Sequence, residues 1–487
     1  MPDLRRQVFE SGKTVSRKAA SRESSRASSR ANSTETSRQS SRNVSRNVSR
    51  NASRQPSDDE DTGSMSDDTA WSTGSLDDLD SAEQGNIDWP QQLSEQIQLI
   101  VDRKRSSVQG REDTYATFCR LAKFHYVEEH LRSHVDELLA AFCKSIKLES
   151  SPRESSLALR ALELLVITVD DNTIYENAEP VLARTIRDST SNGVKVAAIH
   201  CLGACAMLGG AGDDGIMEQM TFLLDIIASD GYSVEAADDP DTVCAALQQW
   251  GFMATGIDDL ESESEDAIQI FIDQLDSSDS NVQIAAGENI ALLYEKSYTP
   301  QEDDDDEPED GAEEGSEDEE EEAEGDGDRL IKRYNAYHNT PELEHQLHQL
   351  ATVHHKRISK HDRKSLHANF TSILTTVQNP RHGPAYNRAI DQSTNRPYGS
   401  RVTVKIGREG VMNIDRWWKW IRLHSLRRLL EGGFAVHYFQ GNRSVLDNLP
   451  VMVSMAAPSG RGRWDSRKAA KPRTSHRWTG VGSSDEE

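Results

Sequence analysis

The sequence predicts an all-α protein: an armadillo- or HEAT-like stack of helical repeats, followed by a small α+β module at the carboxyl end. The first observation is a helix pattern that recurs between about residues 111 and 298. Each unit reads as an apolar helix, a short polar turn and a second helix with small residues on its inner face. The second helices begin near Ser156, Val194, Thr242 and Val282, at intervals of 38, 48 and 40 residues. Such a period is typical of stacked helical repeats.

The second observation is where small and turn-forming residues fall within these units. The connections are rich in Ser, Asp, Asn, Gly and Pro, which break or cap helices. Small residues recur in the second helices, at Ala158, Ala161, Ala197, Ala198, Ala245, Ala246, Ala285 and Ala286. Because small residues let helices approach closely, this pattern favours the stacking of one unit on the next. Stacks of this kind present long surfaces to other macromolecules.

Composition divides the chain into folded and unfolded segments. Only 35% of the residues are hydrophobic and the mean hydropathy is −0.70, so much of the chain has no core to join. We expect a disordered Ser/Arg-rich arm and acidic linker at 1–85, the armadillo-like repeat domain at 86–298, an acidic disordered loop at 299–328, a helix with a basic face at 329–380, the small carboxy-terminal module at 381–455 and a basic disordered tail at 456–487.

The charge is distributed as a mosaic. The net charge is −27, yet residues 302–328 alone hold 19 Asp and Glu, whereas residues 1–54 hold 13 Lys and Arg against 4 acids. The simplest interpretation of the acidic loop is a solvated linker. Alternatively, it mimics nucleic acid, binds histones or basic ribosomal proteins, or masks the basic carboxy-terminal module.

The amino-terminal arm repeats a Ser-Arg pair, mostly every four residues. The resulting Arg-x-x-Ser frames suit a basophilic or SR-type kinase, and each phosphate would add roughly −1.5 to −2 charge. The predicted phosphorylation sites are Ser25, Ser29, Ser41, Ser45, Ser49 and Ser53. The alternative is an unmodified solubilising tail.

The carboxyl half has its own elements. Two apolar stripes predict a helix from Pro341 to about Val377. Alternation at Val402, Val404 and Ile406 predicts a strand. A helix is expected from near Asp415 to the glycines at 432–433, and an alternating run at 434–439 predicts a second strand.

Cationic and aromatic residues alternate on the predicted helix after Asp415, which makes it the strongest candidate site. Its cations would approach nucleic-acid phosphates, and Trp417 and Trp418 would stack on exposed bases. The alternative packs the tryptophans inward and leaves the arginines as a solvated rim. The predicted RNA- or ribosome-binding residues of the module are Arg408, Arg416, Lys419, Arg422, Arg427 and Arg428.

The basic tail adds further candidates around Trp464 and Trp478. Such a segment would order in an RNA channel, whereas a nuclear localisation signal or a nonspecific basic tail is the competing interpretation. The predicted contacts are Arg461, Arg463, Arg467, Lys468, Lys471 and Arg473.

Several kinds of chemistry lack their usual signatures. No GxGxxG after a strand, GxxxxGK[ST], GxSxG or HExxH string occurs, so we expect no catalytic site, cofactor or metal. The histidines of 338–382 fit a polar helix face better than a metal site. The five cysteines contain no CxxC pair and indicate buried thiols in a reducing compartment. No run of 18 apolar residues predicts a membrane span, and the amino terminus has no hydrophobic signal core.

Two blocks of the chain resemble the interferon-related developmental regulator family. The stretch DELLAAFCKSIKLESSPRESSLALRALELLVITV resembles its amino-terminal repeat domain, and KRISKHDRKSLHANFTSILTTVQ with VKIGREGVMNIDRWWKWIRLHSLRRLLEGGFAVHY resembles its carboxy-terminal domain. The DRWWKW variant and the Ser-Arg arm look fungal in style. The resemblance implies regulation without catalysis, either as a nuclear transcriptional co-regulator or as a factor that holds inactive ribosomes out of translation.

These observations predict a non-enzymatic regulator of gene expression in both cytoplasm and nucleus. We expect it neither to bind a membrane nor to act on a small-molecule substrate. Its stack would bind proteins, and its basic module and tail would contact ribosomal RNA. A different expectation is a nuclear co-regulator that recruits chromatin-modifying complexes through the stack alone. A transport adaptor is the third interpretation, for which the stack is short.

Overall fold

The computed structural model describes residues 88–103, 106–300, 330–352, 360–391, 396–400, 402–406, 410–449 and 453–454. The chain divides into two units, Met1–Thr62 and Gly63–Glu487, and every described residue lies in the second. The predicted arm and linker (1–85), most of the acidic loop (299–328) and the basic tail (456–487) lie outside the described residues.

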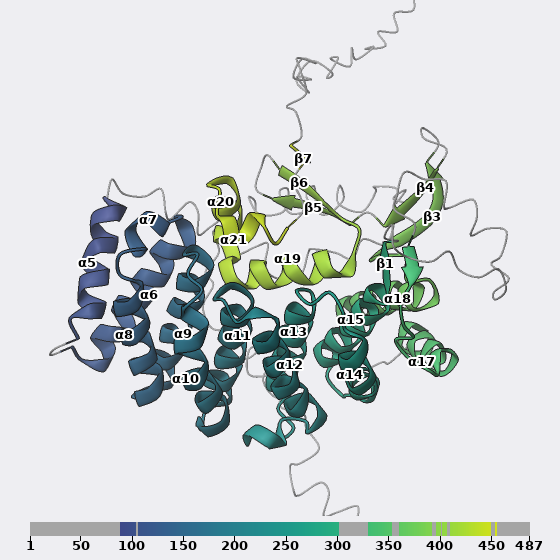
Figure 1. Ribbon diagram of the computed structural model, residues 1–487, viewed down its shortest axis with the longest axis horizontal. Helices are drawn as coiled ribbons and strands as arrows, with labels where there is room; N and C mark the ends of the chain where they lie inside the picture. The colour runs from purple at the N-terminus through teal and green to yellow at the C-terminus, as the bar shows by residue number, and fades with distance from the viewer. Residues whose placement is uncertain are drawn as a thin grey trace, which may run out of the picture. The chain divides into compact units, whose positions relative to one another are not determined.

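Helices fill about the first two thirds of the described residues (Figure 1). They are α5 (Trp89–Val101), α6 (Val108–Phe124), α7 (Glu128–Leu131), α8 (Val135–Leu148), α9 (Pro152–Thr168), α10 (Ile174–Asp188), α11 (Asn192–Leu208), α12 (Gly212–Ala228), the 3₁₀ turn η1 (Tyr232–Val234), α13 (Pro240–Ala254), α14 (Glu261–Gln274) and α15 (Ser280–Lys296). None of the described helices is long and apolar enough to cross a membrane.

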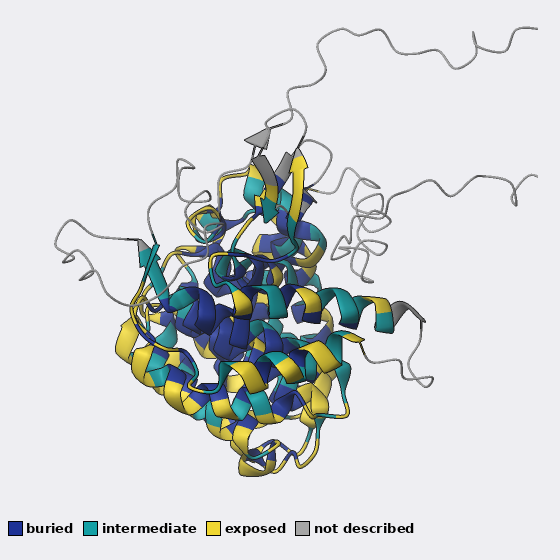
Figure 2. Cartoon of the chain, turned by 90° about the vertical axis from the view of Figure 1, so that its right-hand side faces the viewer, coloured by how far each residue is buried: buried dark blue, intermediate teal, exposed yellow. Residues whose placement is uncertain are grey.

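These helices pack in two rows, which confirms the predicted repeat stack. Helices α6, α9, α11, α13 and α15 lie side by side in one row, and α8, α10, α12 and α14 each pack against a member of it. Helices α17 (Thr340–Thr352) and α18 (Lys360–Gln378) follow the acidic loop and continue the arrangement, since α18 packs on α15 and α17 on α18. Figure 2 shows buried residues between the helices and exposed ones on their outer sides.

Glycines mark the close approach between neighbours in the first row. A Cβ atom on Gly203 of α11 would lie 2.1 Å from Oε1 of Gln249 on α13, and one on Gly251 of α13 would lie 2.2 Å from Oδ1 of Asn289 on α15. Asn289 also donates from Nδ2 to the carbonyl oxygen of Leu247 at 2.9 Å. Glycine at these two positions therefore permits the close spacing of the first-row helices.

Turn residues begin the second helix of each unit. Ser151 accepts a hydrogen bond from the backbone N–H of Glu154 and precedes Pro152, and Asp239 accepts from Thr242 and precedes Pro240. A side-chain cap followed by proline in the first turn satisfies free backbone donors and presets the helical φ.

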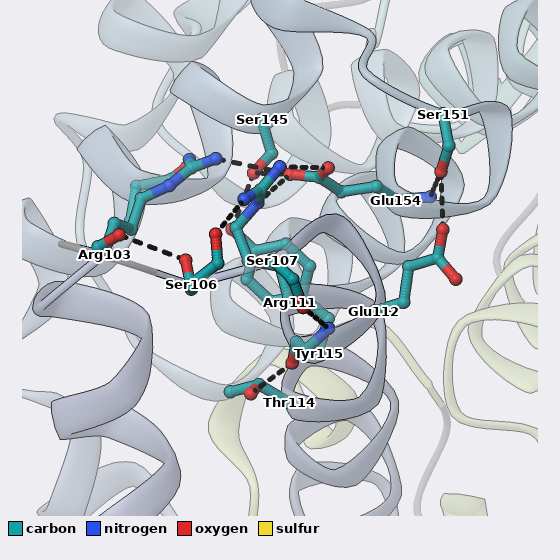
Figure 3. A network of polar contacts seen from close by, with 12 residues as sticks. Arg103, Ser106, Ser107, Arg111, Glu112, Thr114, Tyr115, Ser145, Ser151 and Glu154 are labelled. Carbon is teal, nitrogen blue, oxygen red and sulfur yellow. Dashed lines mark hydrogen bonds and ion pairs between the residues drawn. The ribbon is translucent and has the colours of Figure 1, made fainter.

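A buried carboxylate ties the first helices together (Figure 3). Glu154 of α9 is fully buried and receives Nε and Nη2 of Arg111 at 2.6 and 2.8 Å and Nη2 of Arg103 at 3.2 Å. Ser145 donates to the same carboxylate at 2.9 Å. These partners hold the pKa of Glu154 below its ordinary value although burial opposes that shift.

Short antiparallel strands follow the helices. Strand β1 (Tyr298–Pro300) pairs with β2 (Leu330–Lys332), so the acidic loop connects two paired strands. Strands β3 (Tyr386–Asp391) and β4 (Arg396–Ser400) pair only with each other, and β5 (Val402–Ile406), β6 (Gly410–Ile414) and β7 (Val453–Ser454) form a three-stranded sheet in that order. The predicted strand at 402–406 is confirmed.

The rest of the carboxyl end is helical, and we call residues 416–449 the carboxy-terminal strap. It contains α19 (Trp417–Leu430), the 3₁₀ turn η2 (Glu431–Gly433), α20 (Phe434–Phe439) and α21 (Arg443–Leu446). Helix α19 contacts α9, α13 and α15. The strap therefore packs against the stack.

Two expectations about individual elements are wrong. The alternating run at 434–439 is a helix, because Phe434 and His437, three residues apart, both face the stack. Nε2 of the fully buried His437 bonds the carbonyl oxygen of Ala122 at 3.0 Å. The single helix expected from Pro341 to Val377 is described as two, α17 and α18, which pack against each other.

Candidate nucleic-acid interface

Helix α19 carries most of the described candidate residues, and its first turn is anchored by a carboxylate of the stack. Oε2 of Glu295 on α15 accepts from the backbone N–H of Trp417 at 2.8 Å, and Oε1 accepts from that of Trp418 at 3.1 Å. A carboxylate is well placed there because the free N–H groups and the helix dipole both favour negative charge. Burial nevertheless raises the pKa of Glu295.

Two of the three tryptophans pack inward. Trp417 is fully buried and donates from Nε1 to Oγ1 of Thr376 on α18 at 2.7 Å. Trp420 is 6% exposed and donates to Oε1 of Glu288 on α15 at 3.0 Å. Burial raises the pKa of Glu288 to about 7. Trp417 therefore packs inward, as the alternative interpretation expects, and its indole ring has no exposed face on which a base could stack.

Trp418 is half-buried and lies beneath two cations. The guanidinium carbon of Arg422 is 5.0 Å from the ring centroid, and Nζ of Lys419 is 5.4 Å from it. These cation–π contacts orient both side chains. Lys419 also bonds Asp415 at 2.6 Å.

Arg422 and Arg428 point into the molecule. Arg422 donates from Nε to Oγ1 and from Nη2 to the carbonyl oxygen of Thr255, both at 2.9 Å, at the end of α13. Arg428 donates to Oε1 of Glu163 on α9 at 2.9 Å. Both guanidinium groups therefore attach the strap to the stack, a role that the sequence prediction of phosphate contact did not include.

Arg428 belongs to a chain of five alternating charges. Glu163 also receives Arg160 at 2.7 Å, Arg160 reaches Glu431 at 2.9 Å, and Glu431 accepts from Lys123 on α6 at 2.8 Å. We call these five residues the strap ion network. It joins α6 and α9 to the last turn of α19 and to η2, so it fixes the carboxyl end of the helix.

Close backbone contacts fix the end of the strap. A Cβ atom on Gly433 would lie 1.8 Å from the carbonyl oxygen of Lys123, so only glycine fits there. Asn442 donates to the carbonyl oxygen of Ile167 on α9 at 3.0 Å and caps α21. The strap thus has contacts to the stack at both ends and along its length.

The other candidate residues divide into two groups. Arg416, the N-cap of α19, and Lys419 and Arg427 on the helix are half-buried, and RNA contact by them stays a prediction. The remaining candidates lie outside the described residues: Arg408, Arg461, Arg463, Arg467, Lys468, Lys471 and Arg473, and the serines Ser25, Ser29, Ser41, Ser45, Ser49 and Ser53.

The stack has an unusual charge pattern that the sequence analysis did not single out. Residues 196–295 hold 20 Asp and Glu and no Lys or Arg. Many of these acids are exposed on α12 and α14, among them Asp214, Glu218, Glu265 and Asp273. Within the part of the chain that the structure describes, none of the acids in this stretch forms an ion pair. A scan for cations along the predicted helices would have revealed the pattern.

Metal chemistry finds no support in the described residues, where no group of three or more His, Cys, Asp or Glu side chains is placed to hold an ion. The described cysteines are unpaired thiols, and burial raises the pKa of Cys119 and Cys244 to about 12. Neutral thiols of this kind are poor nucleophiles.

The two helical rows and the strap define a helical-repeat scaffold. The model of the interferon-related developmental regulator family matches residues 57–378, about two thirds of the chain. The chain belongs to this family, and the match covers the stack and ends at the last residue of α18. It is therefore a regulatory protein-interaction scaffold.

A relative in Schizosaccharomyces pombe is 25% identical over 396 residues, which cover 77% of this chain and 80% of the relative. That protein is described as uncharacterized. It adds a fungal relative to the family assignment without adding a function.

Proposed function

We propose that this scaffold is a non-catalytic regulator of gene expression that binds ribosomes and holds them inactive. The observation that carries the proposal is a reversal of charge along the chain. Residues 196–328 hold 39 Asp and Glu and one Lys, whereas residues 329–487 hold 27 Lys and Arg and 12 Asp and Glu. One region thus attracts polycations, and the next attracts polyanions.

A ribosome offers both kinds of partner, because it combines RNA with basic proteins. The carboxy-terminal region would contact RNA phosphates, and the acidic half of the stack would face basic protein segments. Contacts of the strap with α13 and α15 support the proposal, since they give the cationic region an ordered base on the anionic one. Half-buried Arg416 and Lys419 would contribute from α19.

A second candidate is a nuclear co-regulator that recruits chromatin-modifying complexes through protein contacts alone. The inward orientation of Arg422 and Arg428 favours it, because the cationic surface of α19 is smaller than the sequence predicts. We propose that the protein occurs in cytoplasm and nucleus under either function, with phosphates on the Ser-Arg arm adjusting its charge.

A crosslinking pulldown from fungal cells, with RNA and protein partners recovered separately, distinguishes the two. Ribosomal RNA with ribosomal proteins is the expected catch. Chromatin proteins without RNA would contradict the ribosome function and support the co-regulator.

A further inference from the structure

The β3–β4 hairpin presents large side chains to solvent. Ile390 is 61% and Tyr398 is 42% exposed, and Arg388 is exposed beside them. The two strands form a sheet of their own, drawn as a separate hairpin in Figure 1. A two-stranded hairpin is marginally stable alone. Ile390, which pairs with Pro397, and Tyr398 are exposed on opposite faces, so each face presents a large side chain to solvent.

The strand register places a cation across from an aromatic. Asn387 pairs with Gly399, and the register shifts between Asn387 and Ile390. Because side chains alternate along β4, Tyr398 lies on the face opposite Gly399 and Pro397, and the extra residue of the irregular segment places Arg388 and Ala389 across from it. The amide oxygen of Asn387 accepts from the backbone N–H of Ala389 at 2.9 Å, which holds the irregular segment that carries Arg388.

The charge around the hairpin is positive. Residues 386–405 hold four Lys and Arg and one acid, Asp391. An acidic protein segment would pair with the cations, but it would leave the tyrosine ring without a stacking partner. A nucleic acid with unpaired bases uses both, since its phosphates pair with arginine and its bases stack on aromatic rings.

We propose that the β3–β4 hairpin binds single-stranded RNA, with the ring of Tyr398 stacking on a base and Arg388 contacting a phosphate. The inference rests on the RNA contact proposed above and assigns it a site outside the strap. It adds an RNA contact in the β3–β4 hairpin to those predicted for the tail at 456–487, which lies outside the described residues.

Fluorescence anisotropy of the full-length chain with a labelled single-stranded RNA oligonucleotide tests the proposal. Tyr398→Ala should weaken binding about tenfold, the usual range for loss of one stacked base, whereas Tyr398→Phe should bind within about twofold of the parent. Arg388→Glu should also weaken binding and reduce the slope of log affinity against log salt by about one. Tyr232→Ala, which removes a tyrosine that is 62% exposed next to α12, is the matched control and should bind like the parent.

A second measurement locates the contact directly. RNA containing 4-thiouridine should crosslink on irradiation to the peptide that carries Tyr398. The hairpin assignment would be overturned, with the proposed function intact, by the following result: the parent binds RNA, Tyr398→Ala and Arg388→Glu bind it equally tightly, and crosslinks form only at other peptides. Parent protein that binds no RNA would overturn both. Loss of ribosome binding in Tyr398→Ala with unchanged RNA affinity would also overturn the assignment, because the hairpin would then contact a protein.

Discussion

The carboxylate of Glu295 holds the backbone N–H of Trp417 at 2.8 Å, which joins the last helix of the central repeats to the first residue of α19. Since the same carboxylate holds Trp418, a single side chain of the stack satisfies two free donors of the strap. The strap is therefore a part of the folded stack, and its position sets where the cations of α19 lie.

Replacing Glu295 by Ala should destabilise the protein by about 2–4 kcal/mol, because one buried and one partly buried N–H group lose their acceptor. Glu295→Gln should cost less, since the amide oxygen still accepts one of them. Urea unfolding followed by tryptophan fluorescence measures the change. Glu265→Ala, on the exposed side of α14, is the control and should stay within about 0.5 kcal/mol of the parent.

Trp417 offers a test of the packing interpretation. Trp417→Phe keeps most of the buried ring but loses the bond to Thr376, so a loss of about 1 kcal/mol is expected, whereas Trp417→Ala should cost about 3–5 kcal/mol. The measurement is the urea midpoint of each variant. A Trp417→Ala variant as stable as the parent would mean that the strap is not packed as described.

The strap ion network should show coupling between helices far apart in sequence. Glu163→Gln removes the negative charge that Arg160 and Arg428 share and should cost about 3 kcal/mol, because Arg428 loses its ion pair and Arg160 keeps only Glu431. Arg428→Met should cost less, since Glu163 keeps Arg160. A double-mutant cycle between Glu163 and Arg428 should give a coupling of about 0.5–3 kcal/mol, and additive effects would contradict the network.

The dependence of stability on pH should reveal Glu288. Its pKa is about 7 in the folded protein against an ordinary 4.5, so the folded state holds the proton more tightly than the unfolded one. Its contribution to stability is thus fully present below about pH 4.5 and is lost as pH rises through about 7. His437 has the opposite sign, because burial lowers its pKa to about 4 and its contribution is lost as pH falls through that value.

Comparing the parent with Glu288→Gln isolates the first group. As pH rises from about 5 to 7, the unfolding free energy of the parent should fall relative to that of Glu288→Gln. Only the parent has a carboxyl group there that ionises in the unfolded state while it stays protonated in the folded state. Urea midpoints at several pH values measure it. A difference that does not vary with pH would show that Glu288 is ionised in the folded protein.

Sequence alone predicted the repeat stack well because its signals are local. Alanines recur in the buried faces of the second helices, as at Ala198 and Ala245, and caps such as Ser151 and Asp239 precede these helices. These features depend on neighbours a few residues away or one repeat away. The period of the pattern is therefore enough to predict the fold class.

The same reasoning could not place the strap. The acceptor of Arg428 lies 265 residues away at Glu163, and that of Arg422 lies 167 residues away at Thr255. No local pattern encodes such pairs, so arginines spaced for phosphate contact were indistinguishable from arginines that bind the stack. The pattern at 434–439 predicts a strand for a related reason, since its alternation is short and its burial is decided by Ala122 and Lys123 on α6.

Sedimentation of the full-length protein with ribosomes on sucrose gradients tests the central claim most directly. The parent should co-sediment with monosomes from starved cells at low salt and should be released as salt rises, because phosphate contacts release counterions. The double variant Arg416→Glu/Lys419→Glu should be released at lower salt, while Arg184→Glu, an exposed change on α10, should behave like the parent. Parent protein that remains at the top of the gradient at low salt, from growing and starved cells alike, would contradict the ribosome account.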